Sequence, residues 1–153
     1  MKIELKNIKY AAFASEETHC FQATVYLDGV KAGVVSNEGH GGPDMFAPHD
    51  LEEKINAHAR TLPPIDVSDL YKDGEAHTMP QDASTLIGDI LESYLEKKHQ
   101  KRLCAKAVLY RIPGHHYKDG EYHSMKMKYG PDVKAKLVAK YGESLFILNE
   151  NLH

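Results

Sequence analysis

The dipeptide Asp28-Gly29 lies between two runs in which apolar and polar residues alternate, and it constrains the fold more than any other feature. Such a dipeptide is favoured in two-residue hairpin turns, where both central residues need a positive φ. The run 21–27 places an apolar residue at every second position, and the run 30–35 follows as its return strand. An earlier alternating run over 3–10 changes register near Asn7, which predicts a bulge or a bend. The chain is therefore expected to begin with three antiparallel strands.

Three later segments repeat their apolar residues at the spacing of an α-helix, near residues 50–59, 82–98 and 131–141. After the first of them, Pro63-Pro64 cannot continue a helix, because proline lacks an amide hydrogen and clashes with the preceding turn. We therefore expect an internal connector over 61–80.

Further apolar runs predict strands over 103–112, 121–128 and 144–149. The resulting order, β-β-β-α-α-β-β-α-β, groups hairpins apart from helices. This is typical of an α+β fold with antiparallel sheets and about three helices. A chain of 153 residues has the usual size of one domain, so we expect a single α+β domain over 1–153.

The composition argues against several classes of protein. Cys20 and Cys104 are the only cysteines and lie far apart, which argues against a disulfide framework and predicts a reducing, cytoplasmic location. Cys104 falls in an apolar strand pattern, which is more typical of a buried residue than of a nucleophile. The N-terminal residues do not form a signal peptide, and no apolar run reaches the length of a membrane span. A net charge of -3 offers no general attraction for extended nucleic acid.

A nine-residue segment occurs twice: Tyr71–Met79 and Tyr117–Met125 agree at seven of nine positions. One interpretation is a pair of binding loops that present Lys72 and Lys118 together with two histidines. The interpretation we favour is that the two segments share the turn chemistry of an Asp-Gly dipeptide.

Two loops are candidates for ligand binding. Loop 36–44 is rich in glycine, so its backbone N–H groups can approach an anion closely, although an ordinary connection has the same composition. Loop 111–118 combines an arginine, two histidines, a tyrosine and a lysine, which suits a phosphate and a stacked base as well as a solvated hairpin loop. The predicted ligand-binding residues are Asn37, His40, Gly41, Gly42, Arg111, His115, His116, Tyr117 and Lys118.

Ten histidines raise the alternative of a zinc site. Its candidate ligands are His115, His116 and His123, with His77 or His40 in addition. However, adjacent histidines in a strand point to opposite faces, and no HExxH pattern is present. We therefore predict no metal, no cofactor and no catalytic residue.

Six stretches carry a resemblance by general pattern: Phe13–Phe21, Tyr26–Gly29, Ser36–Gly42, Tyr129–Val133, Lys140–Gly142 and Ile147–Asn149. Together they resemble small uncharacterised proteins encoded by phages and prophages. The resemblance implies a role against host defence, either by sequestering a nucleotide signal or by blocking a defence protein.

The function expected from the sequence is a non-catalytic binding protein. It would hold a small phosphorylated or nucleotide-derived ligand between loops 36–44 and 111–118, and we expect a homo-oligomer without a membrane or extended nucleic acid as partner. One alternative is an inhibitor that blocks a host defence enzyme. The other is a hydrolase that depends on a metal bound by histidines.

Overall fold

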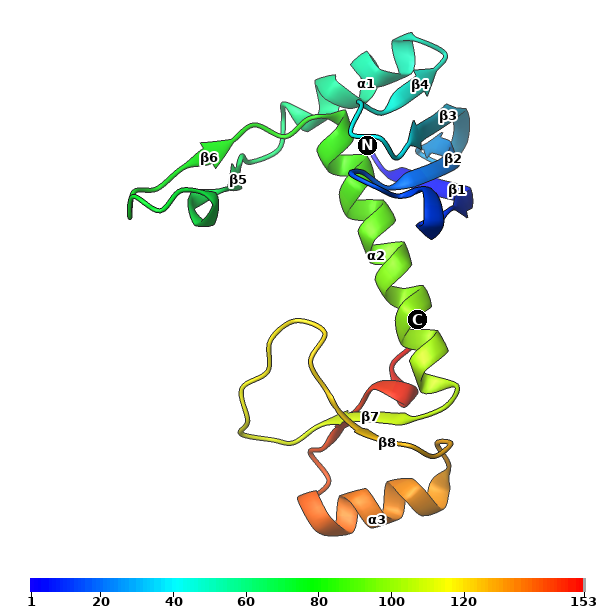
Figure 1. Ribbon diagram of the computed structural model, residues 1–153, viewed down its shortest axis with the longest axis vertical. Helices are drawn as coiled ribbons and strands as arrows, with labels where there is room; N and C mark the ends of the chain where they lie inside the picture. Colours follow the sequence, from blue (N-terminus) through cyan, green and yellow to red (C-terminus); the bar gives the residue numbers. More distant parts are fainter. Residues whose placement is uncertain (153) are drawn as a thin grey trace. The chain divides into compact units, whose positions relative to one another are not determined.

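The computed structural model describes residues 1–152 (Figure 1). The chain divides into two compact units, Met1–Glu92 and Ser93–His153, and the division lies inside its longest helix. Each unit combines helices with antiparallel strands, so the predicted α+β class is confirmed. The organisation of 1–153 as one domain stays a prediction.

The first unit contains a four-stranded antiparallel sheet in the order β1-β2-β3-β4 (Figure 1). Asp28 and Gly29 join β2 to β3 with φ values of 49° and 80°, as the predicted turn requires. β1 changes register against β2 between Lys6 and Lys9, and Asn7 has a φ of 53°, so the predicted interruption of the strand near Asn7 is confirmed. The strands are β1 (Ile3–Tyr10), β2 (Cys20–Leu27), β3 (Val30–Glu38) and β4 (Met45–Ala47).

The core of the first unit combines one face of β2 and β3 with side chains of α1 (Asp50–Ala59) and the first half of α2 (Ala83–Cys104). Gly33 allows β4 and the start of α1 to approach β3, because a Cβ atom at this position would lie 2.1 Å from the carbonyl oxygen of Ala47 and 2.8 Å from Cδ2 of Leu51. α1 is also tied to α2, since the Ala83 N–H donates to Asn56 Oδ1 at 2.7 Å. The buried residues are Phe21, Ala23, Val25, Val35, Leu51, Ile55, Ala59, Ala83, Ile87 and Leu91.

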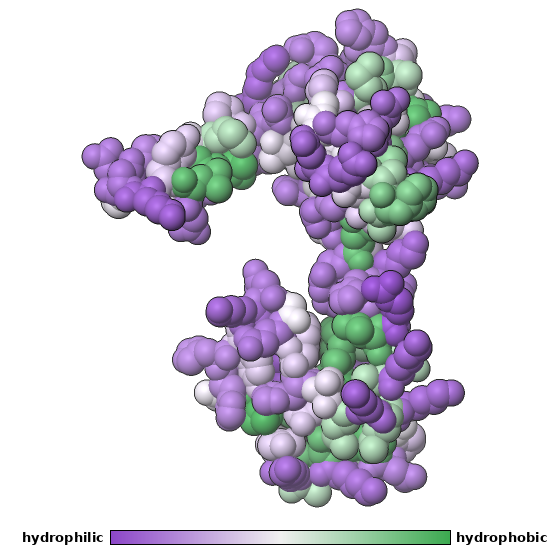
Figure 2. Space-filling model, viewed as in Figure 1, coloured by the Kyte–Doolittle hydropathy of each residue, from purple (hydrophilic) through white to green (hydrophobic). Residues whose placement is uncertain are grey.

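The connector between α1 and α2 contains a short hairpin that the sequence did not predict. β5 (Ile65–Asp66) pairs with β6 (Thr78–Met79), and a single 3-10 turn, Ser68–Leu70, lies between them. The side chains of this hairpin are poorly covered, with Leu70 80% and Tyr71 52% exposed. Figure 2 shows apolar atoms over the hairpin amid hydrophilic side chains.

The second unit contains a three-stranded sheet in the order β8-β7-β9, with both pairs antiparallel. One face of this sheet packs against α3, and the residues buried there are Val108, Tyr110, Leu137 and Ile147. Pro131 begins α3 and Gly142 follows its last residue, as predicted. The elements are β7 (Val108–Arg111), β8 (His123–Met125), α3 (Pro131–Tyr141) and β9 (Phe146–Ile147).

α2 is longer than the predicted 82–98, because it continues to Cys104. The strand expected over 103–112 therefore begins only at Val108, and Cys104 lies in a helix instead of a strand. Residues 99–104 include neither glycine nor proline, so nothing in the sequence stops the helix there. Within residues 1–152 no helix, α2 included, is long and apolar enough to cross a membrane.

Asn149 connects the end of α2 to the start of β7. It lies in the 3-10 turn Leu148–Glu150, where the sequence predicted a continuing strand. Its Nδ2 donates to the carbonyl oxygens of Cys104 and Ala107, at 3.2 and 2.9 Å. Its Oδ1 accepts from the Leu109 N–H at 2.9 Å. One side chain therefore satisfies three backbone groups at this junction.

Glu150 ties the C-terminal 3-10 turn to α3 and makes the second unit sensitive to acid. Its Oε1 lies 2.8 Å from Lys134 Nζ and also accepts from the Tyr129 hydroxyl. The hydrogen bond from Lys134, followed by that from Tyr129, lowers the pKa of the Glu150 carboxyl below its ordinary value of 4.5. An acid whose pKa is lower in the folded state stabilises the protein above its unfolded pKa. That stabilisation is lost as the pH falls through the lower, folded pKa.

We expect Glu150→Gln to be less stable than the original protein at pH 7 and to approach it in stability below the pKa of Glu150. Urea unfolding at pH 7 and at pH 3 measures the difference between the two proteins. A difference that is equal at the two pH values would contradict the assigned role. Glu143→Gln serves as an exposed control in the same unit.

Candidate functional site

Asn37 organises the glycine-rich loop of the first unit. Its side chain is buried, and its Oδ1 accepts from the Thr18 hydroxyl and from the Gly39 N–H, each at 2.8 Å. Its Nδ2 donates to the Gly42 carbonyl oxygen at 3.0 Å and to Asp44 Oδ1 at 2.9 Å. These four bonds match the two lone pairs and two N–H groups of an amide side chain. The side chain of this predicted ligand-binding residue is thus committed to the loop itself.

Gly39 is required at the tip of this loop. It has a φ of 85°, and a Cβ atom there would lie 2.2 Å from the carbonyl oxygen of Ala14. The Gly39 carbonyl oxygen accepts the N–H groups of Glu16, Glu17 and Thr18, at 3.1, 3.0 and 3.4 Å. The loop is therefore fixed against the segment that precedes β2.

The other predicted residues of this loop lie at its surface. His40 is exposed, and its Nδ1 lies 3.3 Å from Glu16 Oε2. The Gly41 N–H donates to Thr18 Oγ1 at 3.3 Å, so this amide contributes to the loop's own structure. Gly42 is exposed and lines a pocket within the first unit.

Arg111 is the centre of the predicted residues in the second unit. Its Nε donates to the carbonyl oxygen of Glu121 at 3.0 Å, and its Nη2 donates to that of Lys118 at 3.3 Å. Its Cζ lies 4.2 Å from the centre of the Tyr122 ring and 5.5 Å from that of Tyr117. Two carbonyl groups and two aromatic rings therefore fix the guanidinium by hydrogen bonds and cation–π attraction.

Aromatic rings surround this arginine. The ring centre of Tyr117 lies 6.3 Å from that of His115 and 5.7 Å from that of His123. The Tyr117 hydroxyl oxygen accepts from the Ile112 N–H at 2.8 Å. The structure thus brings four predicted residues, Arg111, His115, Tyr117 and Lys118, into one cluster. His116 is exposed on the same loop. The predicted residues of loop 36–44 belong to the other unit.

A pocket of about 320 Å³ lies in the second unit next to the Arg111 cluster, and we call it the second-unit pocket. Leu103, Ala107 and Leu109 supply its apolar lining. Tyr122 also lines it, and the same ring carries the guanidinium of Arg111. An apolar wall with a few polar groups at one side is the usual character of a small-molecule site.

The polar lining of the second-unit pocket is rich in hydrogen-bond donors. Glu96 Oε1 accepts from Gln100 Nε2 at 3.0 Å, so one oxygen of the lining carboxylate is engaged. Lys126, Tyr122 and Ser124 line the same pocket, and their side chains carry an ammonium and two hydroxyl groups. Lysine offers three donors and no acceptor. Lys126 balances the charge of Glu96, so the donors favour a ligand that accepts hydrogen bonds, and the nearby Arg111 guanidinium adds the attraction for negative charge.

The sequence did not identify Tyr122, Ser124 and Lys126 as candidate site residues. They alternate along one side of β8 and its flanks, and the same alternation in β7 places Leu109 beside them. The contribution of α2 was missed because the helix was expected to end at residue 98. With the helix extended, Leu103 falls seven residues after Glu96 and thus on the same helical face.

The last residues of the repeated segment form the return strand of a hairpin in both units. Met79 pairs with Ile65 in one hairpin, and Met125 pairs with Val108 in the other. Gly74 and Gly120 have φ values of 76° and 73°, as shared turn chemistry requires.

The side chains of the two copies form different contacts. His77 stacks on Tyr71 with ring centres 4.1 Å apart. Its counterpart, His123, meets the equivalent Tyr117 edge-on at 5.7 Å and stacks on Tyr110 at 5.4 Å.

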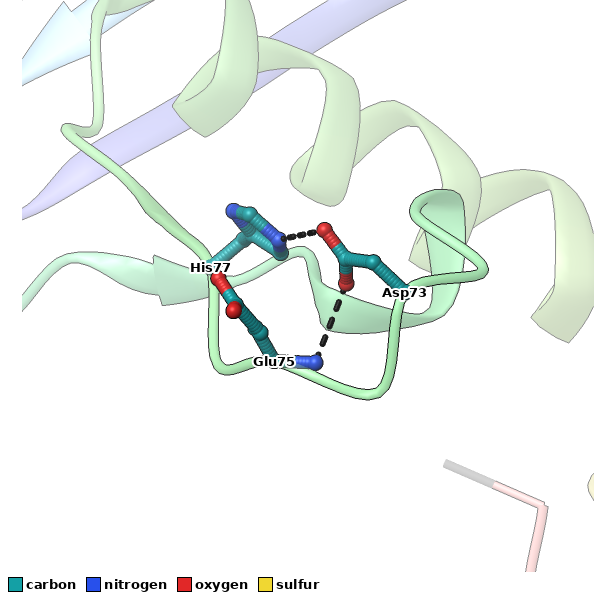
Figure 3. Close-up of side chains that lie close together, drawn as sticks. All are labelled: Asp73, Glu75 and His77. Atoms are coloured by element: carbon teal, nitrogen blue, oxygen red, sulfur yellow. Dashed lines mark hydrogen bonds and ion pairs between the residues drawn. The ribbon is translucent and has the colours of Figure 1, made fainter.

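Among residues 1–152, Asp73, Glu75 and His77 form a group that could hold a metal ion (Figure 3). One ligand atom from each lies within 4.8 Å of the others, and Asp73 Oδ2 lies 2.8 Å from His77 Nε2. Hydrogen bonds from the Glu75 N–H and then from His77 lower the pKa of the Asp73 carboxyl. The candidate zinc ligands His115 and His123 do not belong to such a group within the described residues.

The thiol of Cys104 is not activated, because burial raises its pKa and keeps it protonated near neutral pH. The donor-rich second-unit pocket is therefore the arrangement with the clearest chemistry.

No family model, no curated protein and no solved structure matches this sequence.

Proposed function

We propose that this chain is a non-catalytic binding protein that holds a small phosphorylated, nucleotide-like ligand in the second-unit pocket. The observation that carries the proposal is the pairing of an apolar wall with the Arg111–Tyr122 stack and the Lys126 ammonium. Such a ligand needs both an apolar surface for its base and donors for its phosphate.

The pocket suits the base and sugar of a nucleotide by size and lining. Its volume of about 320 Å³ lies within the range of small-molecule sites. Leu109 and Leu103 offer a flat apolar contact, and Tyr122 offers an aromatic ring for stacking. The ring is held in place by Arg111, which limits the conformational entropy lost on binding.

The phosphate would be bound by Lys126 and Ser124, with Arg111 providing further positive charge. Arg111 does not line the pocket: it uses Nε and Nη2 on backbone carbonyls and adds its positive charge beside the lining Tyr122 ring. His99 also lines the pocket, and its Nδ1 lies 2.9 Å from Nη2 of Arg102. The basic end of α2 thus adds to the attraction for an anion.

Thermal unfolding and calorimetry with ADP-ribose, cyclic GMP and unphosphorylated adenosine test the proposal. We expect a phosphorylated ligand to raise the melting temperature by several degrees and adenosine to do so much less, because bound ligand stabilises the folded state. Lys126→Ala should weaken binding about ten-fold, the value of one charge-assisted hydrogen bond. Mass spectrometry should recover the ligand unchanged.

Lys128→Ala is the matched control. Lys128 is an exposed lysine that also follows β8, but it does not line the pocket. Equal affinity of adenosine and the phosphorylated ligands would contradict the assignment of a phosphate site. Equal loss of affinity in Lys126→Ala and Lys128→Ala would mean that only the overall charge of the protein matters, and that Lys126 does not contact the ligand. Turnover of the ligand would contradict a non-catalytic role.

In a phage setting, a protein of this kind would act by removing a nucleotide signal from a host defence system. A second candidate function is to block a host protein, and the exposed apolar side chains of the β5–β6 hairpin favour it. A homo-oligomer would cover the same hairpin. Light scattering measures the oligomeric state, and co-purification of one host protein without nucleotide would favour the second candidate.

A further inference from the structure

We propose that the first unit contains a separate site for a small organic cation, an amine with an apolar body. The site is a pocket of about 370 Å³ between the loop organised by Asn37 and the first half of α2, and we call it the first-unit pocket. It is independent of the second-unit pocket, because all of its lining residues lie in the first unit.

The walls of the first-unit pocket are apolar. Phe21 comes from β2, Leu91 comes from α2, and Pro43 comes from the glycine-rich loop. Gly88 lies on α2 between Ser84 and Leu91, where its missing side chain leaves open space. An aromatic or aliphatic ligand body would bury its surface against these walls.

The hydrogen-bonding capacity of the side chains around this pocket identifies the polar group of the ligand. The Thr18 hydroxyl donates to Asn37, and Asn37 uses all of its donors and acceptors within the loop. Asp44 accepts from Asn37 through Oδ1 only, which leaves Oδ2 for a ligand. The Ser84 hydroxyl can also accept. The lining therefore favours a ligand that donates hydrogen bonds.

His19 adds no free donor to the pocket. Its Nε2 lies 2.5 Å from Glu92 Oε1, and its Nδ1 lies 3.2 Å from the Tyr10 hydroxyl. A carboxylate can only accept, so Nε2 carries the hydrogen and Nδ1 accepts from the phenol in the neutral ring. Both ring nitrogens are thus occupied by the protein.

The charge around the pocket favours a cation. The Asp44 carboxylate lines the pocket. A second carboxylate, that of Glu92, accepts a hydrogen bond from His19, which also lines the pocket. Within the described residues, the lining includes neither lysine nor arginine. An ammonium group placed at Asp44 Oδ2 would form a charge-assisted hydrogen bond next to apolar walls, where such a bond is strong.

The loop is preorganised for this ligand. Asn37 fixes the position of the Asp44 carboxylate, and the Gly39 carbonyl oxygen fixes the loop against three preceding N–H groups. Since the acceptor is already in place, binding does not need to order the loop.

Calorimetry with three ligands of the same shape tests the proposal: 2-phenylethylamine, neutral 2-phenylethanol and anionic phenylacetate. We expect the amine to bind at least about ten-fold more tightly than the alcohol, and phenylacetate to bind least. Asp44→Asn should remove this preference, because the new amide keeps an oxygen for Asn37 but loses the charge. Ser84→Ala is a second variant at the same pocket.

Asp69→Asn is the matched control, since it removes one exposed carboxylate of the same unit away from the pocket. Equal binding of the three ligands, or an unchanged preference in both Asp44→Asn and Ser84→Ala, would overturn the proposal. Nucleotide binding at the second-unit pocket should be the same in Asp44→Asn. The two sites can therefore fail or succeed separately.

Discussion

Asn37→Ala is expected to lower the free energy of unfolding of the first unit by about 3 kcal/mol, the largest effect of any single substitution considered. The change leaves four groups without their partner: the Thr18 hydroxyl, the Gly39 N–H, the Gly42 carbonyl and Asp44 Oδ1. A buried polar group that loses its partner costs about 1–3 kcal/mol, and the exposed groups among the four can recover water. The amide of Gly39 should also lose its protection against hydrogen exchange.

Urea unfolding and hydrogen exchange of the Gly39 amide measure these two effects. Asn37→Asp separates the donor role from the acceptor role, because a carboxylate can accept from Gly39 but cannot donate to Gly42 or Asp44. It should therefore remain unstable at pH 7. Gln22→Ala, an exposed substitution in β2, should change stability by less than about 0.5 kcal/mol. A stable Asn37→Ala protein with a protected Gly39 amide would contradict the role of Asn37.

Asn149→Ala is expected to destabilise the second unit by about 2 kcal/mol. It removes the acceptor of the Leu109 N–H and the donor of two carbonyl groups, those of Cys104 and Ala107. Leu109 lines the second-unit pocket, so the loss should also weaken binding of a phosphorylated ligand there. Hydrogen exchange at Leu109 and the melting temperature measure the structural part.

Asn151→Ala is the matched control in the same C-terminal segment. The Asn151 side chain makes one hydrogen bond, to the carbonyl oxygen of Ile147 at 2.7 Å, so its loss should cost about 1 kcal/mol or less. If the two variants were equally stable, Asn149 would not have the junction role assigned to it.

Local patterns predicted most of the fold. The hairpin at Asp28-Gly29, the strand interruption at Asn7 and the boundaries of α3 follow from turn and helix rules that act within a few residues. The predicted end of α2 was wrong, because the helix continues to Cys104, whose carbonyl accepts from the side chain of Asn149, 45 residues later in the chain. The β5–β6 hairpin was missed because two paired residues are too few to give an alternating pattern.

The candidate sites were predictable only in part. The sequence indicated Arg111 and Tyr117 by their residue types, and these do lie together. It did not indicate Tyr122 or Lys126, whose place in the pocket depends on the register of β8 against β7. Nor did it indicate the role of Asn37 as an internal support, since burial and partner choice depend on the segment that precedes β2.

The repeated segment has a consequence for how residue roles can be assigned. Seven identical positions preserve the left-handed glycine and the return strand, while the neighbours in space determine what each side chain contacts. His77 has a carboxylate partner in Asp73, and its counterpart His123 has the ring of Tyr110. A role transferred from one copy to the other by sequence identity would therefore be wrong even within this one molecule, because identity conserves the backbone geometry and the tyrosine–histidine contact but not the other partners of the histidine.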